Sequence, residues 1–551
     1  MIIHAATSTD GYKISHGSMY PKGTEFVYSN LTPRGDKHYS KNATKFYDGK
    51  LVWVGAQGAI KEILEIWDKF FSAEKCQAID RYSQRLQGYL GGFDPAVAQL
   101  EALHDLGYLP LEFKSLEEGS KVPMGVPVLT VTNTDPRFFW LVNYLETIIS
   151  AMTWKTATAA TVAAEYKAIC KHYAEITGVD DFTVSVQCHD FSMRGMSGIE
   201  DAARTGLGHL TQFIGTDSLV AMDYADDYYN SGSDLIAISV PATEHAVATS
   251  NILFNESKCD KTARIDAEMD FLEELITERF PTGIISYVSD SFDFWGVVTK
   301  VLPLLKEDVL ARQPSTVAPA KLVIRPDSGD PVKVITGYNV YVCDELTAGL
   351  SKWSIAEWVN RQAKSYEVIK MNGRYWLIND LNTEITEAEA KGAVQCLWDI
   401  FGGTETETGY KLLDSHIGLI YGDSITPERA EQILHRLMEK GFASGNVVLG
   451  VGSMSYQYHT RDTFGFAVKA THITVDGESV PIFKLPTGDA SKASAKGLLF
   501  VGEHNGELSC VDNVHSDVER SPSNLLRTIC KDGEWVVQTT LTKIRDKLNK
   551  G

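Results

Sequence analysis

The feature that most constrains the fold of this sequence is a short apolar run that stops abruptly at charged residues and glycine. Leu322-Val323-Ile324 leads directly into Arg325, Asp327 and Gly329. Three successive apolar residues are typical of a buried strand, and a strand that ends in charge is unusual unless the charges face a ligand. The same design recurs at 182–186 before His189, 213–214 before Asp217, 237–240 before His245, 284–288 before Asp290, 417–420 before Asp423 and 447–449 before Gly452.

Helix-like segments separate most of these runs, and this alternation is typical of parallel strands joined by helices. In α/β barrels the residues that follow the strands form the active site. A single loop of this kind would be an ordinary surface turn rich in Asp and Gly, but seven in succession favour a shared site. We therefore predict an α/β barrel catalytic domain over residues 180–455, interrupted by a peripheral insertion at about 335–412.

The remaining sequence predicts a second domain, since 551 residues are too many for one ordinary core. Helical periodicity and β-like runs alternate before residue 180, with one helix expected around 141–152 and another around 162–176. From residue 464 the sequence pattern becomes that of β-hairpins, with strand-like runs separated by Asp-Gly or Asn-Gly turns. We predict that residues 1–179 and 456–551 together form an α+β domain.

Composition and charge limit the partners. The formal net charge is −20, and a strongly acidic chain is a poor general nucleic-acid binder. We find no signal peptide and no apolar run of membrane-spanning length. The eight cysteines contain no C-x-x-C pair, which is typical of reduced thiols. We expect a cytoplasmic protein that binds neither nucleic acid nor membrane.

The charged residues at the strand ends indicate the chemistry. Asp290 and Asp327 follow successive strands, and Mg²⁺ prefers two such carboxylates together with ligand oxygens. Gly452 and Ser453 follow another strand, as a backbone phosphate cradle requires. His245 alone could equally be a buried structural histidine. The residues by themselves predict a barrel enzyme that binds a phosphorylated substrate together with Mg²⁺. They do not indicate which reaction it catalyses.

Eight motifs nevertheless resemble one family, in order and over nearly the whole chain apart from the insertion. They are 9–13 (TDGYK), 189–195 (HDFSMRG), 215–217 (GTD), 239–245 (SVPATEH), 288–291 (VSDS), 324–329 (IRPDSG), 421–423 (YGD) and 460–462 (TRD). The family is that of the nicotinamide phosphoribosyltransferases, in particular its bacterial and phage branch. The resemblance implies the type II phosphoribosyltransferase fold and a homodimer with two shared active sites.

The implied reaction joins nicotinamide to 5-phosphoribosyl 1-pyrophosphate (PRPP), with Mg²⁺ and with ATP hydrolysis coupled to turnover. By resemblance, nicotinamide is bound by Phe191, Asp217, Arg325 and Tyr12 of the partner subunit. PRPP and the product mononucleotide would be bound by Arg34, Arg194, Asp327, Gly422, Asp423, Gly452, Ser453, Arg461, Lys469 and Lys484. His245 matches the histidine that ATP phosphorylates, with Glu244 beside it. Asp290 and Asp327 are the implied catalytic carboxylates and metal ligands. The chain departs from the family at Ser453, where the phosphate loop usually has glycine.

Three alternatives stay open at this point. A nicotinate phosphoribosyltransferase would share the fold and mechanism, but a carboxylate at Asp217 would repel nicotinate and accept a hydrogen bond from an amide. A Mg²⁺-dependent barrel phosphohydrolase would release phosphate or sugar without consuming nicotinamide. A non-catalytic relative should have lost His245, Asp290 or Asp327, and all three are present.

Overall fold

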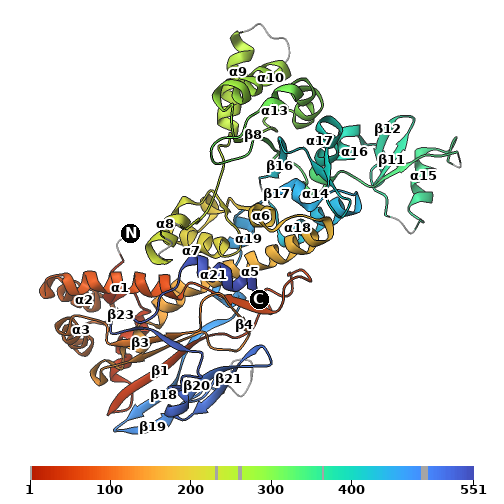
Figure 1. Ribbon diagram of the computed structural model, residues 1–551. Helices are drawn as coiled ribbons and strands as arrows, with labels where there is room; N and C mark the ends of the chain where they lie inside the picture. The colour runs from red at the N-terminus through yellow and green to blue at the C-terminus, as the bar shows by residue number, and fades with distance from the viewer. Residues whose placement is uncertain are drawn as a thin grey trace.

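The long helix α5 (Glu146–Thr177) runs through the middle of the molecule (Figure 1). The structure, a computed structural model, describes residues 3–229, 232, 234–258, 264–345, 347–362, 365–422, 424–485 and 494–550. Two separate helices were predicted, at about 141–152 and 162–176. The single helix α5 covers all of the second range and most of the first. It ends at Gly178, which adopts a left-handed φ of 72° and donates its N–H to the Ala174 carbonyl.

One side of α5 packs against a parallel sheet with the strand order β7-β6-β17-β16-β9-β8 and its helices. The strands are β6 (Cys188–Asp190), β7 (Gly215–Thr216), β8 (Ile284–Val288), β9 (Lys321–Arg325), β16 (Ile417–Tyr421) and β17 (Val447–Val451). The segment 238–243 closes this sheet, because Ile238 bridges Gly215 at one edge and Ala242 bridges Ser286 at the other. The predicted irregular α/β barrel is confirmed, and its strand ends share one rim.

Helices connect the barrel strands. They include α7 (Ile199–Leu210), α8 (Leu219–Tyr229), α9 (His245–Lys258), α10 (Arg264–Glu274), α13 (Lys306–Ala311), α14 (Pro331–Thr336), α17 (Ala393–Phe401) and α18 (Pro427–Glu439). The short helix α19 (Ser453–Gln457) follows the last barrel strand. Helix α18 shows how the sequence specifies them. The Thr426 side chain caps its first turn, Pro427 stands at its first position, and Ile433, Leu434 and Leu437 form its buried face.

Three of the predicted strands are wrong, reduced or shifted. Residues 213–214 precede β7, which comprises only Gly215 and Thr216. Residues 182–186 lie in helix α6 (Asp181–Val186), and the strand begins only at Cys188. The Asp180 side chain accepts the Thr183 N–H at 2.8 Å and so starts a helix, while Phe182 points to solvent. Residues 237–240 form only the isolated bridge at Ile238, because this segment crosses between two edges and does not run along one strand.

The other side of α5 faces a seven-stranded sheet with the order β19-β18-β1-β5-β3-β22-β23. Its strands are β1 (Thr24–Pro33), β3 (Leu111–Ser115), β5 (Leu129–Asn133), β18 (Phe466–Val475), β19 (Glu478–Pro481), β22 (Arg527–Lys531) and β23 (Glu534–Trp535). Strand β1 pairs with β18 over its whole length, so both ends of the chain contribute to one sheet. The domain boundaries at 179 and 456 stay a prediction.

The hairpin turns predicted in the C-terminal region are confirmed. Asp476, Asn505 and Asp532 each adopt a left-handed φ, of 48°, 53° and 53°, and each is followed by glycine. They connect β18 to β19, β20 (Leu498–His504) to β21 (Glu507–Val514), and β22 to β23. Helices α1 (Ala56–Ser72), α2 (Lys75–Leu90) and α3 (Asp94–Leu106), with the short strands β2 (Lys50–Trp53) and β4 (Ser120–Pro123), complete this region.

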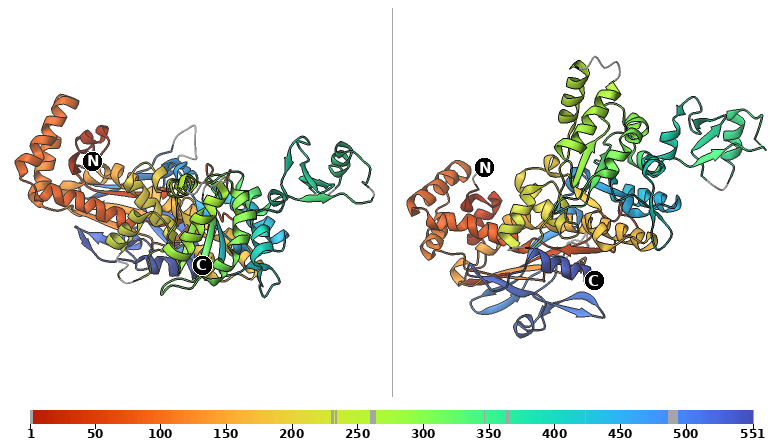
Figure 2. Two further views of the ribbon diagram at one scale, coloured as in Figure 1. Left: turned by 90° about the horizontal axis from the view of Figure 1, so that it is seen from above. Right: turned by 45° about the horizontal axis from the view of Figure 1, so that its top comes forward.

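Much of the predicted insertion projects from the barrel as an arm (Figure 2). The arm contains β10 (Val340–Val342), α15 (Lys352–Val359), β11 (Val368–Met371), β12 (Arg374–Leu377), β13 (Glu384–Ile385) and α16 (Glu387–Lys391). It has a small core of its own, which includes Ile355, Ile369 and Leu381. Helix α17, inside the predicted range, instead packs into the main core. In the part of the chain that the structure describes, no helix is both long and apolar enough to cross a membrane.

Candidate active site

The barrel rim brings the three predicted catalytic residues together. His245 begins α9, Asp290 follows β8, and Asp327 follows β9. His245 Nε2 lies 3.8 Å from Asp290 Oδ1 and 3.8 Å from Asp327 Oδ2. Asp290 Oδ2 accepts the Asp327 backbone N–H at 2.9 Å. The imidazole therefore faces a pair of carboxylates, and that of Asp290 is held by the loop that carries Asp327.

Sequence reasoning missed the residue that orients His245. Its Nδ1 lies 3.0 Å from Ser291 Oγ. The side chain of His245 is 48% exposed, so its Nε2 edge is open to a ligand. Ser291 stands in the 288–291 motif, which was the only signal for it.

The two carboxylates suit Mg²⁺. The Asp290 side chain is 4% exposed, and its buried Oδ1 lacks a hydrogen-bond donor among the described residues. A buried carboxylate oxygen without a donor is costly unless a cation compensates it. The same residues contain no cluster of three or more His, Cys, Asp or Glu arranged for a metal. Mg²⁺ needs only one or two carboxylates, because water and substrate phosphates complete its shell, so the donor set fits.

The loop after β9 is packed tightly against the loop after β16. A side-chain Cβ at residue 422 would overlap Asp327 Oδ1, so any other residue there would displace the Asp327 carboxylate. Arg325 Nη2 lies 3.5 Å from Asp327 Oδ2, and its Nε is buried without a hydrogen-bond partner in the described chain. The guanidinium thus has a donor available for a ligand. Asp423, the next predicted residue, lies outside the described residues.

A cavity of about 420 Å³ opens beside these loops. Its walls contain three of the predicted residues, and the full lining is Phe191, Met193, Arg194, Met196, Gly198, Ile199, Asp217 and Ser218. Asp217 Oδ1 accepts hydrogen bonds from His189 Nε2 at 2.9 Å and from Ser239 Oγ at 2.7 Å. Burial raises the pKa of Asp217, but these donors and the nearby charge of Arg325 outweigh it, and the net pKa lies below 3.8. The cavity therefore offers an aromatic ring and an ionised carboxylate.

Ser453, in the loop predicted to bind phosphate, packs against a neighbouring glycine. Gly452 precedes α19, which begins at Ser453. A Cβ at Gly195 would overlap the Ser453 side chain, so another residue at 195 would force that serine to move. The contact also places the 193–195 turn, which carries Arg194, against the loop that contains Gly452.

The other predicted residues lie in a second group away from the barrel rim. Tyr12 is 64% exposed. Lys469 lies near the positive charges of Arg34, Lys13 and Lys484, and its pKa is lowered chiefly by burial. Glu146 offsets part of this charge, since it pairs with Lys13 at 2.7 Å and with Lys469 at 3.9 Å. Arg34 Nε donates to the Gly465 carbonyl at 2.9 Å. Arg461 forms an ion pair with Asp462 at 3.0 Å. Within the described ranges, no hydrogen bond or ion pair joins this cationic group to the rim residues.

The barrel and its rim define the chain as a type II phosphoribosyltransferase. Residues 186–534 match the family described as "Nicotinate phosphoribosyltransferase (NAPRTase) family". The chain belongs to this family.

Two curated relatives are named nicotinamide phosphoribosyltransferase. The one from Acinetobacter baylyi is 44% identical over 549 residues, which cover 99% of this chain and 97% of the relative. The one from Mycoplasma pneumoniae is 31% identical over 506 residues, or 89% and 93% of the two chains. The crystal structure of human nicotinic acid phosphoribosyltransferase aligns with 98% of this chain and 93% of that one, at 14% identity and a TM-score of 0.48.

Proposed function

We propose that this chain transfers the phosphoribosyl group of PRPP to nicotinamide, giving nicotinamide mononucleotide and pyrophosphate for NAD salvage. The observation that carries this proposal is the ionised Asp217 in the wall of the aromatic cavity. An ionised carboxylate accepts a hydrogen bond from a carboxamide NH₂ and repels the carboxylate of nicotinate. The names of the two curated relatives support the same choice of base.

Each rim residue then has a role. Phe191 stacks on the pyridine ring, which adds modestly to its burial, and Arg325 donates to the amide oxygen. Gly452 and Ser453 offer backbone N–H groups to the 5′-phosphate, with Arg194 beside them. Gly422 and Asp423 hold the ribose together with Asp327.

The chemistry requires no protein nucleophile on the sugar. The bond from the anomeric carbon to pyrophosphate breaks, positive charge develops on that carbon, and the pyridine nitrogen attacks it. The chain contributes position and electrostatic stabilisation. Asp290 and Asp327 would hold Mg²⁺, which when bound supplies positive charge to the pyrophosphate leaving group.

We also propose that ATP assists through His245. Ser291 engages Nδ1, which leaves the Nε2 lone pair to attack the γ-phosphorus of ATP. A nitrogen–phosphorus bond forms as the bond to the ADP oxygen breaks. Phosphohistidine would then add negative charge beside the pyrophosphate end of the site and help to bind Mg²⁺ and substrate.

Two further proposals concern the assembly and its setting. A homodimer would bring the cationic group of one subunit, with Tyr12, to the barrel rim of the other. The cysteines of the described residues are all free thiols, which supports a cytoplasmic location.

The proposed reaction is tested by incubating the protein with nicotinamide, PRPP and Mg²⁺, with and without ATP, and identifying the products. We expect nicotinamide mononucleotide and pyrophosphate in equal amounts, and more of both with ATP. Release of inorganic phosphate or free ribose 5-phosphate without loss of nicotinamide would instead identify a phosphohydrolase.

A further inference from the structure

His189 contacts both of the residues that line the base cavity with chemistry suited to nicotinamide. It lies in β6, two residues before Phe191, and its side chain is 12% exposed. Its Nε2 is 2.9 Å from Asp217 Oδ1. Its ring centroid is 4.7 Å from that of Phe191, with 37° between the ring planes. One imidazole therefore supports both the aromatic wall and the carboxylate.

The hydrogen bonds to Asp217 are asymmetric. His189 Nε2 and Ser239 Oγ both approach the same oxygen, Oδ1, at 2.9 and 2.7 Å. Rotation of a carboxylate about its last torsion is otherwise easy, because that torsion is broad and two-fold. Two donors, one from strand β6 and one from the segment 238–243, fix it, and they leave Oδ2 as the oxygen that can accept a further hydrogen bond.

The position of the His189 ring is fixed by the neighbouring strand. His189 is the direct register partner of Gly215 in β7. A Cβ at residue 215 would lie 2.8 Å from His189 Nδ1. Glycine at this position therefore leaves the space that the imidazole ring occupies. Because Asp217 follows Gly215 by only two residues, the strand that makes room for the imidazole also carries the carboxylate.

We propose that His189 is a positioning residue that sets the preference for nicotinamide over nicotinate. The imidazole donates its Nε2 proton to Asp217 Oδ1, and Oδ2 then accepts from the carboxamide NH₂. This inference rests on the proposed function and deepens it. It assigns the selectivity to a hydrogen-bonded unit, His189–Asp217–Ser239, in which only Asp217 touches the base.

The experiment compares His189→Leu, which removes the donor at similar volume, with His189→Gln, whose amide NH₂ can replace it. Asp217→Asn is the reference for lost selectivity, and His172→Leu, an exposed histidine on α5, is the matched control. For each variant kcat and KM are measured for nicotinamide and nicotinate at saturating PRPP, and KM is measured for PRPP.

We expect His189→Leu to raise the KM for nicotinamide roughly 10- to 100-fold, the range for a lost hydrogen bond to a charged group. The KM for PRPP should stay within about threefold, and the ratio of kcat/KM between nicotinamide and nicotinate should fall toward that of Asp217→Asn. His189→Gln should recover most of both losses, and His172→Leu should match the parent.

An unchanged nicotinamide KM in His189→Leu would overturn the proposal. So would an equal rise in the KM values for nicotinamide and PRPP without rescue by glutamine, because that pattern indicates a general structural role. If the parent itself makes no mononucleotide from nicotinamide, the proposed function is wrong. If the parent is active and His189→Leu has the same KM values and selectivity as the parent, only the positioning role is wrong.

Discussion

His245 is the residue at which two proposed activities can be separated. Its imidazole faces Asp290 and Asp327 but lies outside the base cavity. We predict that His245→Ala abolishes ATP hydrolysis and the ATP-dependent gain, while slow mononucleotide synthesis from PRPP remains. Initial rates with and without ATP, together with mass spectrometry for phosphohistidine, provide the measurement. If ATP accelerates synthesis in the variant as much as in the parent, His245 is not the phosphate acceptor.

Glu268 gives the fold a predictable pH dependence. Its carboxyl in α10 is 1% exposed and accepts the Tyr287 hydroxyl at 2.8 Å. Burial raises its pKa to about 7 against the effect of that hydrogen bond, and the charges of Asp293 and Asp290 add to the rise. Glu268 in the folded protein therefore keeps its proton up to about pH 7, whereas the same group in the unfolded chain loses it near pH 4.5. The free energy of unfolding consequently falls as the pH rises from about 4.5 to about 7.

We predict that Glu268→Gln removes this loss. Relative to the parent, the variant should gain up to about 3 kcal/mol in free energy of unfolding between pH 4.5 and 8. Urea titrations across that range provide the measurement. Glu273→Gln, an exposed change on the same helix, should follow the parent. Parallel pH profiles for Glu268→Gln and the parent would show that the buried carboxyl does not control stability.

At the residue scale, the sequence predicted the rim side chains but not the contacts between them. The positions of Asp290 and Asp327 after strands predicted a shared carboxylate site, and the family resemblance supplied Phe191 and Asp217. Ser291 and His189 hydrogen-bond to partners 46 and 28 residues away. Such contacts depend on where loops from different strands meet, for which a single sequence carries no periodic signal.

Elements were predicted well where several signals agreed. Runs such as 284–288 and 447–449 proved to be strands, and the Asp-Gly and Asn-Gly turns proved to be hairpins. The strand predicted at 182–186 was wrong because a short apolar run does not by itself distinguish strand from helix. The Asp180 side chain caps this segment and favours the helix. The closing segment 238–243 makes single bridges only, which leaves no regular pattern for periodicity to detect.

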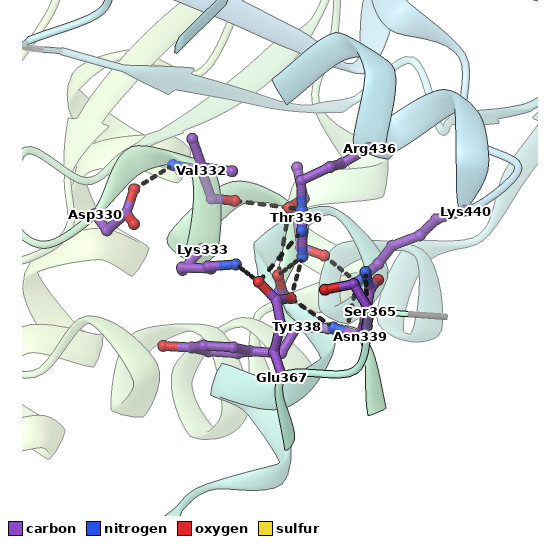
Figure 3. A network of polar contacts seen from close by, with 11 residues as sticks. Asp330, Val332, Lys333, Thr336, Tyr338, Asn339, Ser365, Glu367, Arg436 and Lys440 are labelled. Atoms are coloured by element: carbon purple, nitrogen blue, oxygen red, sulfur yellow. Dashed lines mark hydrogen bonds and ion pairs between the residues drawn. The ribbon is translucent and has the colours of Figure 1, made fainter. Parts of the chain in front are cut away.

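One carboxylate of the arm, Glu367, links it to two barrel helices (Figure 3). Glu367 forms ion pairs with Lys333 of α14 and Arg436 of α18, the latter at 2.8 Å, and accepts the Asn339 N–H at 2.9 Å. Lys440 lies in the same network, and its pKa is lowered to about 8, first by burial and then by Arg436. Without Glu367 the cations of this network would lack a main compensating charge.

We predict that Glu367→Gln destabilises the protein by roughly 1–3 kcal/mol, because it leaves partly buried cations without their partner. It should also speed proteolytic cleavage of the arm. Urea unfolding and limited proteolysis test both effects. The control is Glu384→Gln, which breaks an ion pair with Arg374 on the arm's surface and should cost less than about 1 kcal/mol. Equal losses in the two variants would mean that Glu367 does not anchor the arm.

At the scale of the whole molecule, the proposed homodimer requires each chain to contribute to two sites. The cationic group around Lys469 and the exposed Tyr12 are not joined to the barrel rim within the described chain, although the family resemblance assigns both to substrate binding. In a two-fold symmetric dimer, the cationic group of each subunit would lie against the barrel rim of the other, which would form two equivalent sites. The acidic net charge of −20 makes such a local cationic group the natural place for phosphates.

We predict that Tyr12→Ala and Asp217→Ala chains complement each other. Each variant alone should be nearly inactive, because every site lacks one contact. A mixed dimer contains one intact site, so random mixing should restore about a quarter of the parental activity. Coexpression with two affinity tags isolates the mixed dimer for assay. An inactive mixed dimer would argue that Tyr12 and Asp217 act in the same subunit.

The central claim concerns the choice of base, and a competition measures it most directly. The protein is given equal amounts of isotopically labelled nicotinamide and nicotinate with limiting PRPP and Mg²⁺, and the two mononucleotides are quantified by mass spectrometry. The ionised Asp217 predicts a product that is almost entirely nicotinamide mononucleotide. Equal amounts of the two products, or an excess of nicotinate mononucleotide, would contradict the account.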